Sequence, residues 1–353
     1  MGVVKTRKEA GKRAMRVCLY LEAEKVIARS GFKTAFSQQR RALEQAGVQI
    51  VKDPSNSFDI LHLHWFGPRS FFLLKRAKQE GRKVIVHAHS IGSYDLKNSF
   101  TLSNALAPLY DRYLKYFYDL SDCIFTPSIH AKQFLQSQGL QKPIAVVSNG
   151  IDRERFSFCE QKRREYRERF GLERFTVFSA GHIIPRKGVR EFIEVAERLP
   201  EFDFVWFGHC WNKLLSFYPE MHKRLSERPA NLIMPGFVED TPAAFAAGDL
   251  LLYPSHGETQ GMVLLEAASL RRPIVLRDLP EYRALGFMHG QNCLMGQTVE
   301  NFAAQAQQLA EDTALRERIA SGAEMLAEAN AMEGIGERLK GLYEAVLHDR
   351  LVT

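Results

Sequence analysis

The sequence predicts an α/β protein with two domains, each built on a parallel β-sheet. At 353 residues the chain is longer than a single hydrophobic core usually serves. Short apolar segments typical of buried strands alternate with stretches long enough for crossover helices, which is the βαβ pattern of a parallel sheet. This alternation runs through the chain twice, so the sequence predicts one architecture repeated.

The first series of elements begins with a strand at residues 16–21. A turn at Ser30-Gly31-Phe32-Lys33 comes next, followed by an amphipathic helix through Leu43. The later strands of this series are predicted at residues 60–64, 84–87, 123–126 and 144–147. The second series has predicted strands at residues 176–180, 204–207, 232–234, 250–253 and 274–276. From Val299 onward, alanine-rich segments predict helices and no further strand.

Composition limits the class of protein. With 45% hydrophobic and 25% charged residues, the chain is typical of a soluble globular protein. It contains no apolar run near the roughly 20 residues of a membrane-spanning helix, and its basic N-terminus does not resemble a secretory signal. The five scattered cysteines form no Cys-x-x-Cys pair, which favours a reducing, cytoplasmic compartment and argues against a zinc site. The net charge of +7 suits nucleotide diphosphates, anionic lipid or nucleic acid, so charge alone does not decide the partner.

The most informative segment surrounds two carboxylates, Glu258 and Glu266. The residues Asp249 to Tyr253 predict a short buried strand that Pro254 ends, so the segment from Glu258 to Gly261 falls in a strand-to-helix turn. In a parallel sheet this turn lies at the carboxyl edge, where ligands bind, and the free N–H groups of the helix start can hold a diphosphate. The segment therefore predicts a sugar-nucleotide site.

This segment resembles the Glu-x7-Glu motif of the retaining glycosyltransferases of family 4, whose two Rossmann-like domains face each other across a cleft in the GT-B arrangement. Further segments in the same order resemble the donor-phosphate loop, the interdomain linker and the histidine-ended strands of that family. These segments are Gly181 to Gly188, Ser148 to Asp152 with Phe156, Asp59 to His64, and Val84 to His89.

The basic, polar composition of residues 1–14 predicts either a flexible leader or an upstream extension of a chain that begins at Met15. The resemblance implies an N-terminal acceptor domain at 15–152 and a C-terminal nucleotide-sugar domain at 153–325. Helices in residues 326–353 are expected to pack back toward the N-terminal domain, as the last helix does in the resembled fold.

The resemblance also implies the site residues. Glu258 would accept hydrogen bonds from the donor sugar, Glu266 from the ribose, and Lys187 would bind the diphosphate. The family usually has arginine at the position of His182. Either the neighbouring Arg186 supplies that charge, or a neutral His182 makes phosphate binding depend on Lys187 alone. The catalytic residues are then His89, Glu258 and Lys187. The donor-binding residues are Gly31, His182, Arg186, Lys187, Glu258, Thr259, Gln260, Gly261, Met262, Val263 and Glu266.

No metal or cofactor is expected. The sequence contains no Asp-x-Asp motif, the usual anchor for manganese or magnesium in the other large glycosyltransferase fold. The histidines His62 and His64 lie at a strand end that neighbours that of His87 and His89, so the group could suggest a metal. Because the two strands come from separate places in the sequence, they show no ligand spacing typical of zinc. Retention of anomeric configuration is implied by the family. In the absence of an evident nucleophile, we expect front-side attack by the acceptor hydroxyl, with the departing phosphate oxygen as base.

Two segments mix aromatic side chains with cations at helical spacing, residues 69–78 and 110–118. They suit an interface with anionic lipid, but the same spacing also fits helices whose Phe72, Leu73, Tyr113 and Phe117 face the core while the cations stay in water. The residues proposed for acceptor or membrane contact are Phe71, Phe72, Lys75, Arg76, Arg112 and Lys115.

Within family 4, the pattern is most similar to bacterial glycolipid synthases. It implies UDP-glucose or UDP-galactose as donor, diacylglycerol or glucosyl-diacylglycerol as acceptor, and a cytoplasmic protein attached peripherally to the anionic inner face of the membrane. A capsule or cell-wall glycosyltransferase acting on a lipid-diphosphate-linked sugar is the alternative. A non-catalytic scaffold stays open because of His182, whereas a nucleic-acid-binding protein has no motif to support it.

Overall fold

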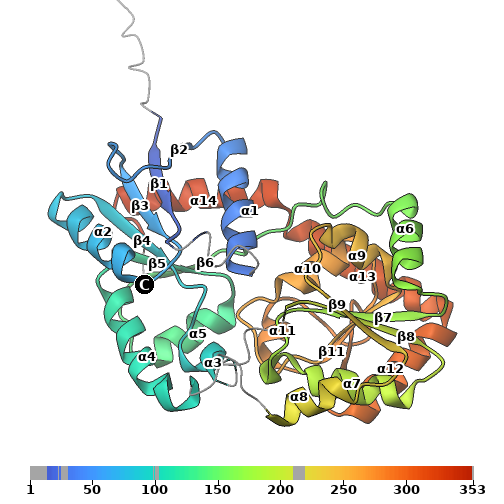
Figure 1. Cartoon of the computed structure of the whole chain (residues 1–353). Coiled ribbons are helices and arrows are strands. Elements are labelled where there is room, and N and C mark those ends of the chain that lie inside the picture. Colours follow the sequence, from blue (N-terminus) through green and yellow to red (C-terminus); the bar gives the residue numbers. More distant parts are fainter. Residues whose placement is uncertain are drawn as a thin grey trace, which may run out of the picture.

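The computed structural model describes residues 14–22, 24, 31–97, 99, 103–209 and 219–351. These residues form two α/β lobes that lie side by side (Figure 1). The predicted basic leader lies outside the described residues, apart from Ala14. The two predicted parallel sheets are confirmed, each with six strands.

The N-terminal lobe holds the sheet β2-β1-β3-β4-β5-β6, in which neighbouring strands are all parallel. Its strands are β1 (Arg16–Tyr20), β2 (Gln49–Val51), β3 (Ile60–Leu63), β4 (Lys83–His87), β5 (Cys123–Thr126) and β6 (Ile144–Val146). Its helices are α1 (Gly31–Gln45), α2 (Pro68–Gln79), α3 (Ser93–Leu96), α4 (Ser103–Asp119) and α5 (Ile129–Ser137). The three-residue strand β2 was not predicted, because it is too short to show an apolar pattern.

The C-terminal lobe holds the parallel sheet β12-β11-β10-β7-β8-β9. Its strands are β7 (Thr176–Ala180), β8 (Asp203–Phe207), β9 (Leu232–Gly236), β10 (Leu250–Tyr253), β11 (Ile274–Arg277) and β12 (Leu294–Gly296). Around it lie α6 (Glu160–Phe170), the 3-10 turn η1 (Pro185–Lys187), α7 (Val189–Arg198), α8 (Pro219–Ser226), α9 (Thr241–Ala247), α10 (Met262–Ser269), α11 (Pro280–Ala284), α12 (Val299–Glu311) and α13 (Thr313–Ala329). All five predicted strands are present, and the short edge strand β12 is additional.

The strand orders show where each sheet can bind a ligand. Read from β9, the C-terminal sheet has the order of a dinucleotide-binding domain, and its direction of winding reverses between β7 and β10. The N-terminal sheet has a flavodoxin-like order instead, and its winding reverses between β1 and β3. Ligands of open α/β sheets bind at such switch points, beyond the carboxyl ends of the strands. The loops after β7 and β10 are therefore the first place to look for a nucleotide.

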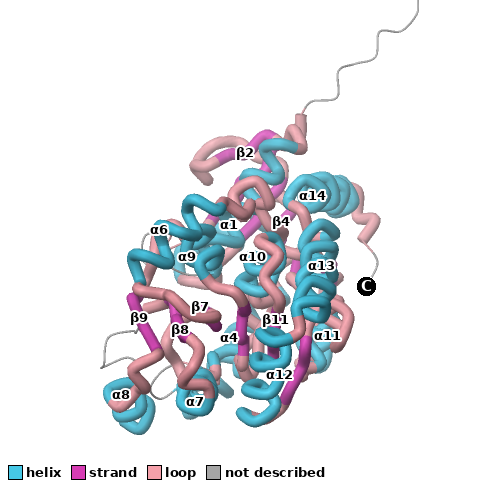
Figure 2. Tube along the Cα trace, turned by 90° about the vertical axis from the view of Figure 1, so that its right-hand side faces the viewer, coloured by secondary structure: helices cyan, strands magenta, loops and turns pink. Residues whose placement is uncertain are grey.

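The last helix, α14 (Met332–Leu347), belongs to the C-terminal end of the chain but packs on the N-terminal lobe beside α1 (Figure 1). Its Gly336 lies so close to α1 that an added Cβ would be 2.3 Å from the carbonyl oxygen of Ala42. Tyr343 of the same helix is fully buried among residues of the N-terminal core. Figure 2 shows α12, α13 and α14 following one another along one side of the molecule. Both lobes are thus tied together at the back of the fold.

Among the described residues, each helix is too short or too polar to span a bilayer.

Candidate active site

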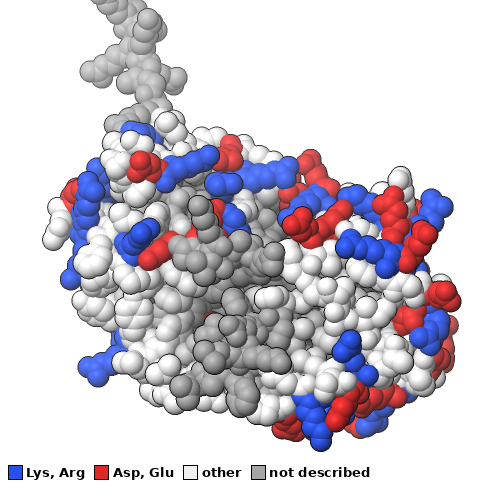
Figure 3. Space-filling view, in the orientation of Figure 1, with Lys and Arg blue, Asp and Glu red and all other residues white. Residues whose placement is uncertain are grey.

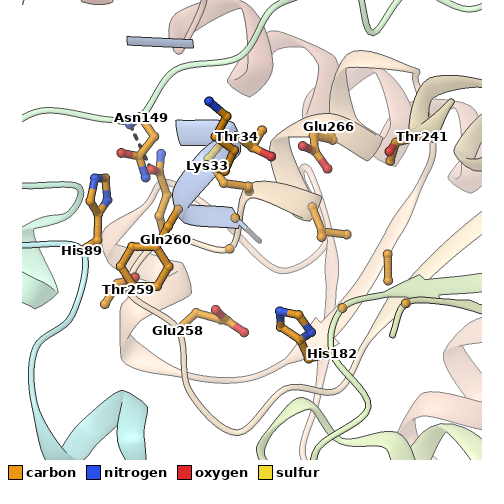
Figure 4. A pocket seen from close by; sticks show the side chains of 18 of the residues that line it. Lys33, Thr34, His89, Asn149, His182, Thr241, Glu258, Thr259, Gln260 and Glu266 are labelled. Carbon is orange, nitrogen blue, oxygen red and sulfur yellow. Dashed lines mark hydrogen bonds between the residues drawn. The ribbon is translucent and has the colours of Figure 1, made fainter. Parts of the chain in front are cut away.

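A cleft of about 1090 Å³ lies between the two lobes, at the switch points of both sheets. Every residue predicted to bind the donor lines it, together with the predicted catalytic His89. Figure 4 shows Glu258 beside His182, Glu266 farther along α10, and His89 on the opposite side, where the N-terminal lobe begins. The structure therefore brings together residues that lie up to 235 positions apart, from Gly31 to Glu266.

A buried ion pair connects the two loops of the C-terminal switch point. Lys187, at the end of η1, pairs through Nζ with Glu258 Oε1. The same oxygen accepts hydrogen bonds from the hydroxyls of Tyr253 and Ser255, both at 2.9 Å. Burial raises the pKa of Glu258, but Lys187 and Arg186 outweigh it, so the pKa lies below its usual value. Glu258 is thus a charged carboxylate, held in place by its neighbours, that can accept hydrogen bonds.

Lys187 is a cation ready for an anionic ligand. Burial lowers its pKa, and the attraction of Glu258 opposes that shift. Its Nζ also lies 3.1 Å from the hydroxyl of Tyr253. A diphosphate that enters the cleft could pair with the ammonium group of Lys187, which is already buried away from water.

Gly188 explains how the two loops approach each other. It has a φ of 73°, in the left-handed region, and it ends the η1 turn. A Cβ at this position would lie 2.4 Å from the carbonyl oxygen of Pro254, in the loop after β10. Only glycine satisfies both conditions, so Gly188 has a structural role in this loop.

Arg186 is shared between the lobes. Its guanidinium donates to the carbonyl oxygen of Gly257 at 2.6 Å and to Ser99 Oγ of the N-terminal lobe at 3.1 Å. It also lies 3.8 Å from Glu258 Oε1. A second contact across the cleft joins the hydroxyl of Tyr94 to the carboxylate of Glu281. Arg186 therefore contacts both lobes beside Glu258.

His182 adds no charge to this site. Burial first, and then the neighbouring Lys187, lower its pKa to about 4. The imidazole is therefore neutral at physiological pH, and Lys187 and Arg186 are the cations that the loop after β7 brings to the cleft.

The loop after β10 ends at Gly261, whose φ of 72° turns the chain into α10. The side chain of Gln260 does not face the donor position. It donates to Ser148 Oγ at 2.6 Å and accepts from the backbone N–H of Asn149 at 3.0 Å, which ties this loop to the interdomain linker. Gln260 can still offer its backbone N–H to a ligand, as the sequence predicts.

Glu266 lies in the second turn of α10 and faces the cleft. Burial raises its pKa to about 7, with Arg155 opposing the shift. At neutral pH it is costly to ionise this buried carboxyl group, unless a ligand donates hydrogen bonds to it.

His89 follows β4 on the N-terminal side of the cleft. Its Nε2 lies 3.0 Å from Nδ1 of His64, and its ring centroid lies 4.2 Å from the ring centroid of His87. Burial lowers its pKa to about 3, so the ring is neutral at physiological pH. His89 can therefore hydrogen-bond a substrate hydroxyl without carrying charge.

The sequence did not single out three residues that line the cleft from the N-terminal lobe, namely Trp65, Phe66 and Asp95. Tyr110 lines the same side, although the sequence placed it only in the aromatic and cationic segment 110–118. Trp65 and Phe66 directly follow the histidine-ended strand, and that position could have identified them. Asp95 lies in the four-residue helix α3, which no sequence pattern indicated, and burial raises its pKa to about 6.

The residues predicted to contact acceptor or membrane lie outside the cleft, on α2 and α4. The alternative that Phe72 faces the core is wrong, since its side chain is 69% exposed, whereas Phe117 is fully buried as that alternative predicts. The side chain of Tyr113 is 36% exposed, and its hydroxyl donates a hydrogen bond to the carbonyl oxygen of Phe66. Lys115 is paired with Asp119 at 2.7 Å.

Comparison with known proteins agrees with this geometry. Residues 22–155 match a model of Glycosyltransferase Family 4, and residues 174–312 match a model of Glycosyl transferases group 1. The processive diacylglycerol alpha-glucosyltransferase of Acholeplasma laidlawii is 32% identical over 94% of this chain and 99% of that protein. The chain belongs to glycosyltransferase family 4.

Other similarities agree with this family. The alpha-galactosylglucosyldiacylglycerol synthase of Streptococcus pneumoniae is 28% identical over 78% of this chain and 75% of that protein. HepE of Anabaena, solved with UDP and glucose, superposes with a TM-score of 0.75 over 94% of this chain and 100% of that chain, at 17% identity. This glycosyltransferase therefore has the GT-B fold that the sequence predicts.

Proposed function

We propose that this glycosyltransferase moves glucose or galactose from a UDP-sugar to a membrane lipid, either diacylglycerol or glucosyl-diacylglycerol. The observation that carries the proposal is the buried Lys187–Glu258 pair at the C-terminal switch point, with His89 across the cleft. The pair offers a cation for a diphosphate and a carboxylate for sugar hydroxyls. The lipid acceptor is supported by two relatives whose names refer to diacylglycerol glycosylation, which match 94% and 78% of this chain.

The proposed reaction retains anomeric configuration. The acceptor oxygen bonds to the anomeric carbon on the face that the diphosphate leaves, and the acceptor proton passes to the departing phosphate oxygen. Oε1 of Glu258 is poorly suited to act as a nucleophile, because it already accepts hydrogen bonds from Tyr253, Ser255 and Lys187. Holding the reactants in position would supply much of the rate.

The diphosphate is proposed to bind without a metal ion. Lys187 and Arg186 supply positive charge, and the start of α10 supplies backbone N–H groups at the positive end of its dipole. These groups can stabilise the charge that develops on the leaving UDP.

A surface on α2 and α4 is proposed to bind the membrane. We call it the apolar patch and define it by Phe72, Leu106, Leu109, Tyr113 and Tyr116, all exposed. The rings of Phe71 and Tyr116, with centroids 6.2 Å apart, place the two helices side by side. In Figure 3 the face over α4 is mostly uncharged, with a cation at its margin. Arg69, Lys75, Arg76 and Arg112 are exposed on the same helices, which suits an anionic lipid surface.

Replacing Phe72 and Leu109 together with serine is expected to weaken binding to liposomes containing anionic lipid by about tenfold, because two apolar side chains no longer enter the interface. The measurement is sedimentation with liposomes at low and high salt. The control is Met325→Ser, which removes a similarly exposed apolar side chain from α13. An equal loss in the control, or binding that high salt leaves undiminished, would contradict the proposed surface.

The proposed function is tested by UDP release and product analysis with UDP-glucose, UDP-galactose and UDP-N-acetylglucosamine. Each donor is supplied with diacylglycerol, with glucosyl-diacylglycerol or with neither, in anionic micelles containing EDTA. We expect turnover that depends on lipid and uses one hexose. Turnover without lipid would point to the polysaccharide acceptor instead, and no turnover with any donor would point to a scaffold.

A further inference from the structure

Three histidines meet behind the N-terminal wall of the cleft. His62 and His64 come from β3 and its end, and His87 ends the neighbouring strand β4. Side chains two residues apart on a strand point to the same face, and the register pairs His62 with Ile85, two residues before His87. All three side chains therefore share one face of the sheet. One ring nitrogen from each lies within 4.8 Å of the others.

Each of these buried rings has one nitrogen without a hydrogen-bond partner among the described residues. The atoms are Nε2 of His62, Nε2 of His64 and Nδ1 of His87. Buried polar atoms are nearly always satisfied in folded proteins, so three unpartnered nitrogens in one cluster indicate a common partner that the chain itself does not supply.

The second nitrogen of each ring has a neighbour. Nδ1 of His62 lies 2.7 Å from the Tyr343 hydroxyl, and Nδ1 of His64 lies 3.0 Å from Nε2 of His89. Nε2 of His87 lies 3.5 Å from the side-chain amide nitrogen of Gln39, which also donates to Asn149 Oδ1 at 3.0 Å. Turning over both amides keeps the bond between them and presents the Gln39 oxygen to His87. Each histidine can thus donate its N–H outward and keep a lone pair on the unpartnered nitrogen. This is the arrangement that metal-binding histidines adopt.

The ring spacing also fits one central ion. The ring centroids of the three histidines are 4.3, 5.0 and 5.4 Å apart. Imidazoles bound at about 2.0–2.1 Å to a single tetrahedral ion would have centroids about 5 Å apart. Burial and neighbouring histidines lower the pKa of all three, so the rings are neutral, as ligands must be.

We propose that His62, His64 and His87 form a buried site for a divalent metal ion of the zinc class, with a water molecule as the fourth ligand. Imidazole suits zinc and similar late transition metals. The three ligands do not line the cleft, whereas His89 does, so this ion would not touch the donor diphosphate. It would join β3 to β4, hold α14 through Tyr343, and position His89 through His64. This proposal departs from the sequence-based expectation of no metal at this position alone.

The test is the metal content of the full chain, purified with its affinity tag removed. Zinc and other metals are measured by mass spectrometry, and the stripped protein is then titrated with Zn²⁺ and with Co²⁺. We expect about one ion per chain and, with Co²⁺, the visible absorption of a tetrahedral nitrogen-rich site. His62→Gln and His87→Gln are each expected to lower the affinity at least about 10²-fold. The control His348→Gln, at an exposed position, should bind like the unmodified chain.

Two results would overturn the site. One is an unmodified chain that binds no stoichiometric ion in excess Zn²⁺, which decides the question even if the histidine variants fail to fold. The other is a folded His62→Gln or His87→Gln variant, judged by circular dichroism, that binds as tightly as the control. None of these measurements uses turnover, so they stand or fall separately from the proposed glycosyl transfer.

Discussion

Replacing Lys187 with methionine is expected to lower kcat/KM for sugar transfer by about 10²–10³-fold, since the variant loses a preorganised charge on the leaving diphosphate. Lys187 is buried at the switch point, and the charges near it are those of Glu258 and Arg186. Steady-state UDP release measures the effect. Lys162→Met is a matched control, because Lys162 forms an exposed pair with Asp240, and its turnover should stay near normal.

The same substitution is expected to destabilise the protein. Without Lys187, Glu258 stays buried without its main counterion, and breaking such a pair costs about 3 kcal/mol or more. The double variant Lys187→Met with Glu258→Gln should regain most of the lost thermal stability but none of the activity. Differential scanning fluorimetry separates the two effects. A Lys187→Met variant with near-normal turnover would show that another group holds the diphosphate.

The strands and the two turns of the candidate site follow from the sequence because both depend on local patterns. The apolar strand at Leu250 to Tyr253, the proline that ends it and the glycine before α10 place Glu258 at the carboxyl edge of the sheet without any tertiary information. The edge strands β2 and β12 have three residues each, and no periodicity is measurable over that length.

Contacts between the lobes could not be predicted in this way. Arg186 reaches Ser99, and the side chain of Gln260 bonds to the linker instead of facing the donor. Both depend on how the two sheets are placed relative to each other, and no local sequence pattern records that placement. The histidine-ended strands suggested that His62 and His87 lie near each other, but sequence spacing gave no metal-ligand pattern, since the two residues come from different strands paired only in the folded sheet.

Glu266 should couple donor binding to pH. Burial raises its pKa to about 7 from an ordinary value of 4.5, so between these values the folded chain binds more protons than the unfolded chain. Stability therefore falls as pH rises through this window, and the burial cost, about 3 kcal/mol, is fully present above pH 7. Ribose hydroxyls that donate to the carboxylate would favour its charged form. Donor binding should then release a proton near neutral pH.

Glu266→Gln is consequently expected to be more stable than the unmodified chain at pH 8 and equally stable near pH 4. Its binding of UDP-sugar at pH 8 should be weaker by about 10–100-fold, because charged hydrogen bonds to the ribose are lost. Calorimetric titration with UDP in buffers of different ionisation enthalpy measures affinity and proton release together. Glu311→Gln, at an exposed position, is the control and should change neither quantity. If the unmodified chain bound UDP with the same affinity at pH 6 and pH 8 and released no proton, Glu266 would not be the ribose-binding carboxylate, and its raised pKa would reflect burial in the fold alone.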